Sequence, residues 1–376
     1  MNRLKKRYSE ILDWLESLNE NKIVPGLDRM EELMHCLGNP EKELEIIMIG
    51  GTNAKGSTCF SLNSTLTKAG IKTGCFTSPH LHSVRERILL GEELIPIEEF
   101  CACLSKIKEI TTEFRIKSTY FEVLTATAYY YFNSKNVDYA LMEIGLGGEW
   151  DAVNIGQAKI AILTTLGLDH EEYLGSTLES IAITKSKIVS DKTVVITGWP
   201  KEYHKFIPQC WNFNYGKNTN DWIRYALKVL KLDCPVNIIS IPGRYEIAEN
   251  FTLDTAHNTQ AIKFLMNKRR DYQKILIGIL KDKDIENIIC SFPTNCEILV
   301  CDLETERGVS SSKLSEICLK HGYQSTEFAR VSDAMEYAAR HKTLVTGSFY
   351  TVSAAREFLK LKGYCLLYTS PSPRDS

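Results

Sequence analysis

The chain has 376 residues, of which 44% are hydrophobic and 24% charged, and its formal net charge is −2. This composition is that of an ordinary soluble protein long enough for two domains. The near-neutral charge excludes the basic surface of a nucleic-acid or membrane-surface binder, and no apolar run approaches the roughly 18 residues that a membrane helix needs. The basic start, "MNRLKKRYSE", lacks the apolar segment of a signal peptide. We therefore expect a cytoplasmic protein with no nucleic-acid or membrane partner.

The cysteines and the last residues carry separate information. The 12 cysteines are scattered through segments that otherwise look like core, which favours reduced, buried thiols. Cys101 and Cys103 are too close together for a zinc knuckle or a thioredoxin pair.

The final stretch, "CLLYTSPSPRDS" (365–376), has no periodicity and resembles a translated sequencing adapter. We exclude it from the prediction of the fold.

Apolar periodicity predicts strands and helices that alternate along the chain. In the first part we expect helices over residues 8–18, 57–69, 96–109, 119–134 and 177–187, and strands over 45–49, 73–77, 139–144, 159–166 and 193–197. The alternation restarts after "IPGR" (241–244), with strands over 251–254, 274–280, 297–301 and 343–347 and helices over 258–268, 310–320, 332–340 and 349–360.

This order predicts an α/β protein, because strands that alternate with helices form mainly parallel sheets covered on both faces. We expect an N-terminal P-loop-type domain over residues 1–242 and a smaller C-terminal Rossmann-like domain over 243–364, with the adapter-like tail over 365–376. Each part is large enough for a domain.

The stretch "IGGTNAKGST" (49–58) stands between a predicted strand and a predicted helix. This is the setting of a phosphate-binding loop, where backbone N–H groups and the positive end of the helix bind anionic oxygens. Lys55 would then reach the outer phosphates and Ser57 would bind Mg²⁺. The full eight-residue P-loop pattern is not met, since position 49 is Ile. A plain strand-to-helix turn is therefore the alternative.

Two further polar groups follow predicted strands, where ligands bind in parallel α/β sheets. Glu143 precedes the glycine-rich "GLGGEW", and Asp169 and His170 follow the strand over 159–166. A neutral imidazole binds metals, and a neighbouring acid orients it. The alternatives are a solvated carboxylate that caps a helix for Glu143 and a purely structural role for His170.

Two other candidates have similarly open interpretations. Lys185 lies among apolar residues on a predicted helix. It is either a functional lysine or a surface lysine of an amphipathic helix. Asp254 ends a strand just before His257 and Asn258. A carboxylate there can accept ribose hydroxyls, whereas Asp254 and Asn258 can equally be cap residues.

Taken together, these stretches resemble the folylpolyglutamate synthase/dihydrofolate synthase family of the Mur ligase superfamily. The family's GTNGKGS stands here as "GTNAKGS", its TSPHL and ERI as "TSPHLHSVRERI", and its EVGLGGRLDATN as "EIGLGGEWDAVN". Its GLDH segment stands as "GLDHEEYLGSTLESIAITKSKI". "YFEVLT", "IPGRYE", "LDTAHN", "IGILKDKD" and "TGSFYTVS" match further stretches, so the resemblance runs in order from about residue 26 to residue 352.

The resemblance implies an ATP-driven ligase that joins L-glutamate to dihydropteroate or to a folate through an acyl phosphate, in a site completed by domain closure. It implies ATP as a substrate, Mg²⁺ and a monovalent cation as candidate cofactors, and a monomer. The implied catalytic residues are Lys55, His170 and Lys185, and the implied metal ligands are Ser57, Ser78, Glu143, His170 and a carbamylated Lys185. The implied ATP-binding residues are Thr52, Asn53, Ala54, Lys55, Gly56, Ser57, Thr58, Asn220, Arg244, Asp254 and His257. The implied folate-binding residues are Gly26, Arg29, Pro79, His80, Tyr120, Phe121, Trp150, Asp151 and Ala152, with Tyr120 or Phe121 stacked on the pterin ring.

The chain departs from the family pattern at several positions. Ala54 replaces a glycine, which costs on the order of 1 kcal/mol if its φ is positive. Glu149 replaces an arginine, and Thr184, Ser186 and Lys187 replace three residues around Lys185. The segment between Thr197 and Ile241 is shorter than usual, and Asn220 is a stand-in for an adenine-binding asparagine. These departures leave two alternatives open: an impaired homologue that binds nucleotide or folate without turnover, and a Mur-type ligase with another acid substrate. The sequence leaves the acceptor undecided.

Overall fold

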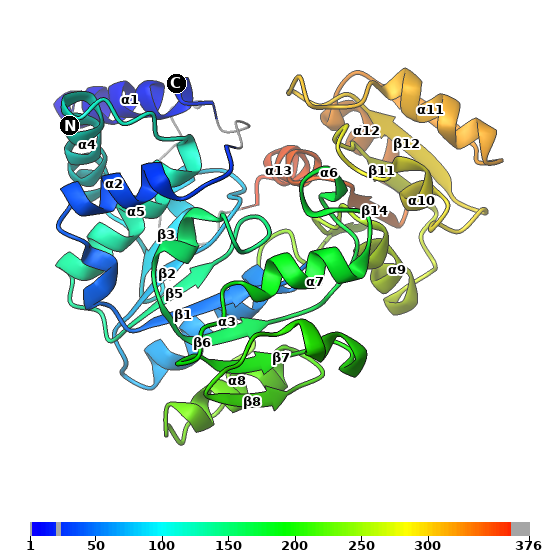
Figure 1. The fold of residues 1–376 in the computed structure, drawn as a ribbon. Coiled ribbons are helices and arrows are strands. Elements are labelled where there is room, and N and C mark those ends of the chain that lie inside the picture. The colour runs from blue at the N-terminus through cyan, green and yellow to red at the C-terminus, as the bar shows by residue number, and fades with distance from the viewer. Residues whose placement is uncertain (1, 20–23, 362–376) are drawn as a thin grey trace. The chain divides into compact units, whose positions relative to one another are not determined.

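The structure is a computed structural model that describes residues 2–19 and 24–361, and the adapter-like tail lies outside the described residues. Of the described residues, those up to 166 together with 178–239 form one compact unit, and 167–177 together with 240–361 form a second. Each unit is built on one mostly parallel sheet with helices packed on it (Figure 1). The predicted α/β class is confirmed.

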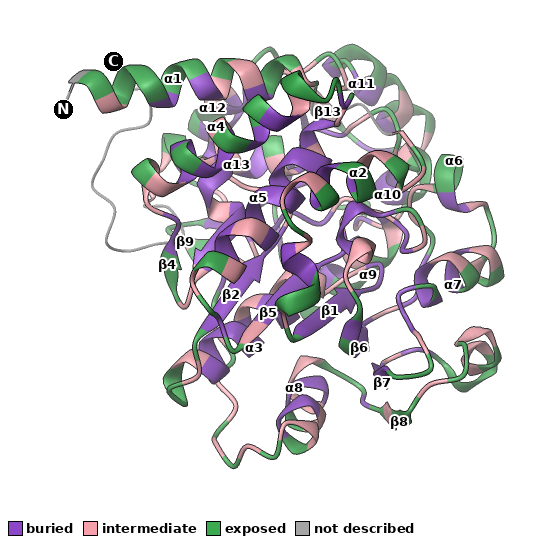
Figure 2. Ribbon diagram, turned by 60° about the vertical axis from the view of Figure 1, so that its left-hand side comes forward, coloured by how far each residue is buried: buried purple, intermediate pink, exposed green. Residues whose placement is uncertain are grey.

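The first unit contains an eight-stranded sheet in the order β4-β3-β2-β5-β1-β6-β7-β8. The neighbouring strands β2, β5, β1, β6, β7 and β8 pair in parallel. At one edge of the sheet, β3 pairs antiparallel with both β2 and β4. All five residues of β1 are buried, as Figure 2 shows, which explains its continuous apolar sequence. The strands are β1 (Ile46–Gly50), β2 (Thr73–Phe76), β3 (Ile88–Leu90), β4 (Glu93–Leu94), β5 (Tyr139–Glu143), β6 (Ala158–Leu163), β7 (Val194–Thr197) and β8 (Asn212–Tyr215).

Helices cover both faces of this sheet. A Cβ at Gly74 on β2 would meet the ring of Phe132 on α5, whereas the next residue, Cys75, lies against Cys59 on α3. Because neighbouring residues of a strand point to opposite faces, α3 and α5 lie on opposite sides. The helices of this unit are α1 (Asn2–Ser17), α2 (Asp28–Cys36), η1 (Pro40–Glu43), α3 (Lys55–Lys68), η2 (Val84–Arg87), α4 (Ile97–Glu113), α5 (Tyr120–Ser134), η3 (Ala152–Ile155), α7 (Leu178–Ser186), η4 (Lys201–Phe206) and α8 (Thr219–Val229).

The second unit contains a six-stranded sheet in the order β13-β12-β11-β14-β10-β9, in which only β9 runs antiparallel to its neighbour. Its core gathers the apolar side chains of the central strands, such as Ile275, Ile298 and Leu344. The strands are β9 (Glu246–Ala248), β10 (Phe251–Leu253), β11 (Lys274–Ile277), β12 (Glu297–Cys301), β13 (Ser325–Phe328) and β14 (Thr343–Thr346). The helices are α6 (Glu171–Leu174), α9 (Thr259–Lys268), α10 (Ile285–Ile289), α11 (Ser311–Lys320), α12 (Val331–Ala338) and α13 (Phe349–Phe358).

The elements expected from the sequence form, but several of their ends differ from the prediction. α1 begins at Asn2 and not at residue 8, α4 extends to Glu113, and the strands expected over 159–166 and 274–280 end at Leu163 and Ile277. The elements that the sequence did not reveal are short or polar, such as β8 and β13 at the two sheet edges. α8 was also missed, and its start is fixed by Asn218, whose side chain accepts from the N–H of Asp221 at 3.1 Å. Over residues 2–19 and 24–361, no helix has the length and apolarity needed to cross a membrane.

The close approach of α5 to β2 is testable at Gly74. A Cβ there would lie 2.4 Å from a ring carbon of Phe132, so Gly74→Ala is expected to lower the free energy of unfolding by about 1–3 kcal/mol through overpacking. Denaturant unfolding measures the loss. The double variant Gly74→Ala/Phe132→Leu should recover part of it, and strictly additive losses would contradict this packing.

Candidate active site

The loop between β1 and α3 is held by the end of β6. The N–H of Thr52 donates to the carbonyl of Thr165 at 2.8 Å, and the N–H of Asn53 donates to the Thr165 hydroxyl at 2.9 Å. Gly51 has φ 137°, and a Cβ there would lie 2.0 Å from Oγ1 of Thr164. Only glycine fits this position. The hydrogen bonds to Thr165 hold the loop in place without a ligand.

Ala54 stands in the left-handed conformation directly before α3, with φ 66° and ψ 6°. The family's glycine would adopt this conformation without strain, whereas the Cβ of alanine costs on the order of 1 kcal/mol.

Two lysine side chains converge on one carbonyl of this loop. Nζ of Lys55, on α3, donates to the oxygen of Gly51 at 3.0 Å, and Nζ of Lys185, on α7, donates to the same oxygen at 3.1 Å. Lys185 is only 5% exposed, so the alternative of a surface lysine is wrong. Two ammonium groups this close repel each other, and an anion bound beside them would lower that energy.

The glycine-rich segment after β5 allows this burial. A Cβ at Gly148 would lie 2.6 Å from the carbonyl oxygen of Thr184 and 3.1 Å from Cα of Lys185. The absence of a side chain at Gly148 therefore brings α7 close enough for Lys185 to reach the loop. Nearby, Nζ of Lys187 lies 3.9 Å from Oε1 of Glu149, so two residues that depart from the family pattern form an ion pair with each other.

A buried carboxylate stands beside the start of α3. Glu143, at the end of β5, is 3% exposed, so it is not the solvated carboxylate of the alternative interpretation. Its Oε2 accepts from the N–H of Ser78 at 3.0 Å, and a Cβ at Gly56 would lie 3.5 Å from the same oxygen. Ser78 and Glu143, both predicted metal ligands, therefore lie together next to the residue that precedes Ser57.

This donor set fits Mg²⁺. Hydroxyl and carboxylate oxygens are its preferred ligands, and Mg²⁺ is usually held by one or two carboxylates together with substrate phosphates. No cluster of three or more His, Cys, Asp or Glu side chains suited to a metal occurs among the residues that the structure describes. The first unit accordingly offers a partial oxygen site beside the loop and not a closed metal cage.

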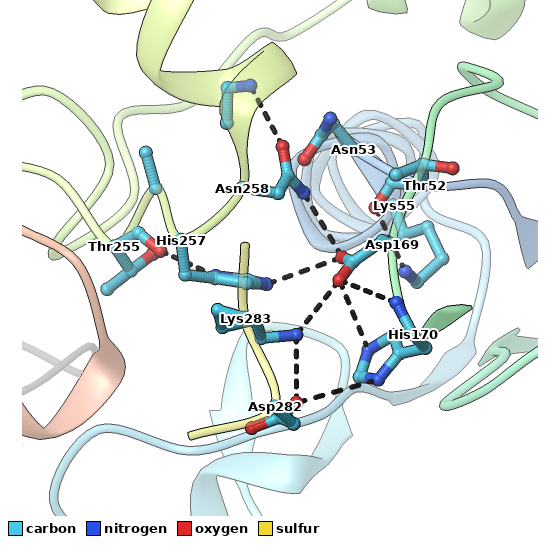
Figure 3. A network of polar contacts seen from close by, with 12 residues as sticks. Thr52, Asn53, Lys55, Asp169, His170, Thr255, His257, Asn258, Asp282 and Lys283 are labelled. Carbon is cyan, nitrogen blue, oxygen red and sulfur yellow. Dashed lines mark hydrogen bonds and ion pairs between the residues drawn. The ribbon is translucent and has the colours of Figure 1, made fainter. Parts of the chain in front are cut away.

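A second polar network lies within the second unit (Figure 3). Oδ1 of Asp169 lies 2.9 Å from Nζ of Lys283, and its Oδ2 accepts from the side-chain amide of Asn258 at 3.1 Å. Nε2 of His257 lies 3.7 Å from the same Oδ2. Burial tends to raise the pKa of Asp169, but His170 and His257 in their protonated forms and the charge of Lys283 outweigh it and hold that pKa well below its usual range. Asp169 is therefore a buried anion surrounded by donors.

The two histidines of this network are held differently. Nδ1 of His257 lies 2.8 Å from the carbonyl oxygen of Thr255, and burial, reinforced by the charge of Lys283, lowers the pKa of His257 to about 4. His170 adopts a left-handed backbone conformation with φ 52° at the start of α6. Its Nδ1 lies 4.0 Å from Oδ2 of Asp282. His257 is thus kept neutral, and His170 is oriented between two carboxylates.

The remaining predicted nucleotide-binding residues fall in both units. In the second unit, Asn258 caps α9 through the N–H of Ala261, which confirms the cap alternative for Asn258. The oxygens of Asp254 accept from the N–H groups of Tyr245 and Ala256, both at 2.8 Å. The guanidinium of Arg244 lies 5.1 Å from the ring centre of Phe349.

In the first unit, Asn220 lies on α8, next to Thr219. The Thr219 hydroxyl oxygen is 3.5 Å from that of Thr58 on α3. This contact brings the start of α8 to α3 through Thr219 and not through Asn220. Its own Oδ1 accepts from Nε of Arg224 at 3.4 Å.

The predicted folate-binding residues of the first unit are linked by polar contacts around the start of α5. Arg29 donates to Glu122 at 2.8 Å and to the carbonyl of Val24 at 2.7 Å. Glu122 also closes the capping box of Thr119, accepting from its N–H at 2.7 Å. Gly26, with φ 105°, provides the turn before Arg29. The start of α5 is thereby fixed by a charge pair.

The aromatic candidates differ in their surroundings. The guanidinium of Arg87 lies 5.5 Å from the ring centre of Tyr120, which is 4% exposed, and its Nε donates to Nδ1 of His80 at 2.9 Å. Phe121 is half-buried and packs against Phe76, with ring centres 5.8 Å apart. Phe121 is therefore the more accessible of the two rings proposed to stack on a pterin.

The other candidates follow the glycine-rich turn and the SPHL segment. Trp150 is 56% exposed, whereas Asp151 and Ala152 are buried. Asp151 accepts from the N–H groups of Leu146 and Val153 at 2.7 and 2.9 Å, and burial raises its pKa to about 6. Pro79 follows a cis peptide bond after Ser78.

The Mur ligase middle domain family matches residues 49–289. The chain is 30% identical over 328 residues to a probable dihydrofolate synthetase of Schizosaccharomyces pombe, covering 70% of this chain and 78% of that protein. It belongs to the folylpolyglutamate synthase/dihydrofolate synthase family of Mur ligases. The predicted family and the predicted class of ATP-dependent amide ligase are confirmed.

Other relatives in this family cover nearly the whole chain. The dihydrofolate synthase/folylpolyglutamate synthase of Escherichia coli is 28% identical over 404 residues, with 93% of this chain and 94% of that protein covered. The solved structure of E. coli FolC with DHPP and ADP has a TM-score of 0.84 at 27% identity, covering 94% and 97% of the two chains. The Yersinia pestis bifunctional enzyme, solved with AMPPNP and a Mn ion, has a TM-score of 0.83 at 25% identity and covers 94% and 98%.

Some side chains of the two networks were not predicted from the sequence as site residues. Lys283 and Asp282 lie in "ILKDKD", which was quoted for the resemblance without a role for either residue. Thr164 and Thr165 hydrogen-bond to the loop, but in the sequence they are two threonines at the end of a predicted strand, with nothing further that indicates this role. The signal available for all four was their position at a strand end.

The strain at Ala54 gives a direct test. Ala54→Gly is expected to raise the free energy of unfolding by about 1 kcal/mol, because glycine adopts φ 66° without a Cβ penalty. Ala69, at the other end of α3 with φ −81°, is the matched control. Ala69→Gly should lower stability by about 0.5–1 kcal/mol. Urea unfolding gives the free energy of unfolding of both variants. A loss of stability in Ala54→Gly would contradict the assigned conformation.

Proposed function

We propose that this chain is an ATP-dependent ligase that adds L-glutamate to dihydropteroate or to the γ-carboxylate of a folate. The observation that carries the proposal is the pair of ammonium groups of Lys55 and Lys185 on the carbonyl of Gly51, in a loop that the strand ends hold in place. Family membership supports it, as do the DHPP and ADP named for the E. coli structure.

The chemistry requires activation, because a carboxylate is a poor electrophile. The substrate carboxylate attacks the γ-phosphorus of ATP, ADP leaves, and the amine of glutamate then attacks the acyl carbon as phosphate leaves. Lys55 and the loop N–H groups would hold the phosphoryl oxygens, where preorganised positive charge lowers the energy of the developing charge. Mg²⁺, when bound, would supply further charge neutralisation beside Ser57, Ser78 and Glu143.

Lys185 has a specific electrostatic reason to be carbamylated. As an ammonium group, its Nζ shares one carbonyl oxygen with Nζ of Lys55. Addition of CO₂ to the neutral amine would convert this repulsion into attraction and provide an anionic oxygen ligand. We therefore propose that Lys185 acts as a carbamate. For His170, in the second unit, the proposed role as a metal ligand rests on the resemblance.

In the second unit, we propose that Arg244, Asp254 and His257 contact the nucleotide. His257, whose pKa of about 4 keeps it neutral, would do so as an uncharged hydrogen-bonding group. The folate acid would bind in the first unit near Arg29, His80 and Phe121, where the half-buried ring offers a flat apolar face.

Product analysis by mass spectrometry tests the proposed activity. The protein is incubated with ATP, Mg²⁺ and L-glutamate, with dihydropteroate or tetrahydrofolate as acceptor. A product heavier by one glutamyl residue is expected with at least one acceptor, and the identity of that acceptor decides the substrate. Tight ATP binding without product would instead support an impaired homologue, which the strained Ala54 favours.

Lys185→Ala is expected to lower turnover at least 100-fold while the fold is retained, because alanine suits the helix but provides neither charge nor carbamate. The exposed Lys192, a few residues further on, is the matched control, and Lys192→Ala should leave turnover unchanged. ADP release and thermal unfolding are measured in parallel. Near-normal turnover in Lys185→Ala would refute the proposed role.

Removal of divalent metal provides an independent test. Treatment with EDTA is expected to abolish acceptor-dependent ADP release, and added Mg²⁺ to restore it, because hydroxyl and carboxylate oxygens beside the loop suit a hard cation. Glu143→Gln should require a higher Mg²⁺ concentration for half-maximal rate. An unchanged Mg²⁺ dependence in Glu143→Gln would exclude this carboxylate as a ligand.

A further inference from the structure

Within the second unit, Cys290 follows the end of α10, His321 follows the end of α11, and Glu286 lies in the first turn of α10. Both helices are labelled in Figure 1. Sγ of Cys290 lies 3.3 Å from Nδ1 of His321. The other ring nitrogen, Nε2, is buried and makes no hydrogen bond, and its contact with Oε2 of Glu286 at 3.5 Å is electrostatic. These residues take no part in the networks described above, and the proposed ligase reaction does not use them.

The order of the three groups gives each ring nitrogen a different role. A carboxylate facing Nε2 favours the tautomer that carries its proton there, which leaves the lone pair of Nδ1 directed at Cys290. Cys290 thus has a base within reach of its proton. The other charged or titratable groups beside this cluster are Lys320, whose Nζ lies 2.8 Å from Oε1 of Glu286, and Tyr323.

Cys290 also differs from the other cysteines in its accessibility. It is the exposed cysteine among those within residues 2–19 and 24–361, so the expectation of buried thiols is wrong at this position. Burial raises the pKa of the thiols of Cys59, Cys101, Cys103, Cys296, Cys301 and Cys318. Those thiols are both less accessible and less ionised, and reactivity should concentrate at Cys290.

We propose that Cys290 is a nucleophilic thiol that undergoes thiol–disulfide exchange with low-molecular-weight disulfides, with His321 as its base. The Sγ proton passes to Nδ1 of His321, and the thiolate attacks one sulfur of the disulfide. A new sulfur–sulfur bond forms on Cys290 as the original one breaks. The departing thiolate takes the proton from the imidazolium and leaves as a free thiol, so the small disulfide is the only oxidant.

The expected rate advantage follows from the thiolate fraction. A thiol without a neighbouring base is only a few per cent ionised at pH 7, so a base that takes the proton as the thiol attacks should raise the rate of exchange, by about tenfold. The rate at Cys290 should also fall less between pH 8 and pH 6 than that of a thiol without a neighbouring base.

Site-resolved kinetics on the whole folded protein test the proposal. The probe is 5,5′-dithiobis(2-nitrobenzoate), followed by absorbance, with the modified cysteine identified by peptide mass. Cys290 is expected to react about tenfold faster at pH 7 than the partly exposed Cys234. Cys290→Ser should remove the fast phase, and the control Cys234→Ser should leave it intact.

The role of His321 is tested separately. His321→Gln should bring Cys290 to the rate and pH dependence of Cys234, and Glu286→Gln should slow it by a smaller factor, with circular dichroism confirming the fold. Equal rates for Cys290 and Cys234 in the unmodified protein would overturn the proposal without any variant. An unchanged rate and pH dependence in His321→Gln would also overturn it.

Discussion

Positive charge concentrated at one backbone turn is the constraint on which the first unit depends. Lys55 and Lys185 come from different helices, and their ammonium groups meet at the oxygen of Gly51. Gly51 adopts φ 137°, which favours glycine, and the turn stays in place because Thr164 and Thr165, directly after β6, hydrogen-bond to Asn53. Two positive charges this close repel each other, and an anion bound beside them would lower that repulsion.

The second unit contains a buried negative charge instead of clustered positive charges. Asp169 is 7% exposed in its side chain, and an isolated buried carboxylate is costly. Lys283, Asn258 and the histidines surround it, so it remains ionised. The same contacts connect the segment after β6 to α9 and to the segment that leads into α10. One buried anion thus fixes the positions of His170 and His257.

The sequence predicted the parts of this arrangement that are local. The apolar strand, the glycines and the lysine of "IGGTNAKGST" indicate a phosphate loop by their order alone, and the predicted strand ends place Glu143 and Asp254 correctly. The burial of Lys185 was not predictable from its own helix, because it depends on Gly148. Similarly, Lys283 meets Asp169 across 114 residues of sequence. Neither contact has a periodic signal, since tertiary packing and not local propensity creates it.

The departures from the family pattern gain a physical interpretation from these contacts. Glu149 adds a negative charge after the glycine-rich segment, but Lys187, also a departure, pairs with it at 3.9 Å. Because both side chains are partly exposed, the pair contributes little stability, and its consequence is local charge balance beside α7. Ala54 has no such partner: its strain resides in the backbone, where no side chain can offset it. The two departures are therefore of different kinds, one compensated within the chain and one carried as a cost in folding free energy.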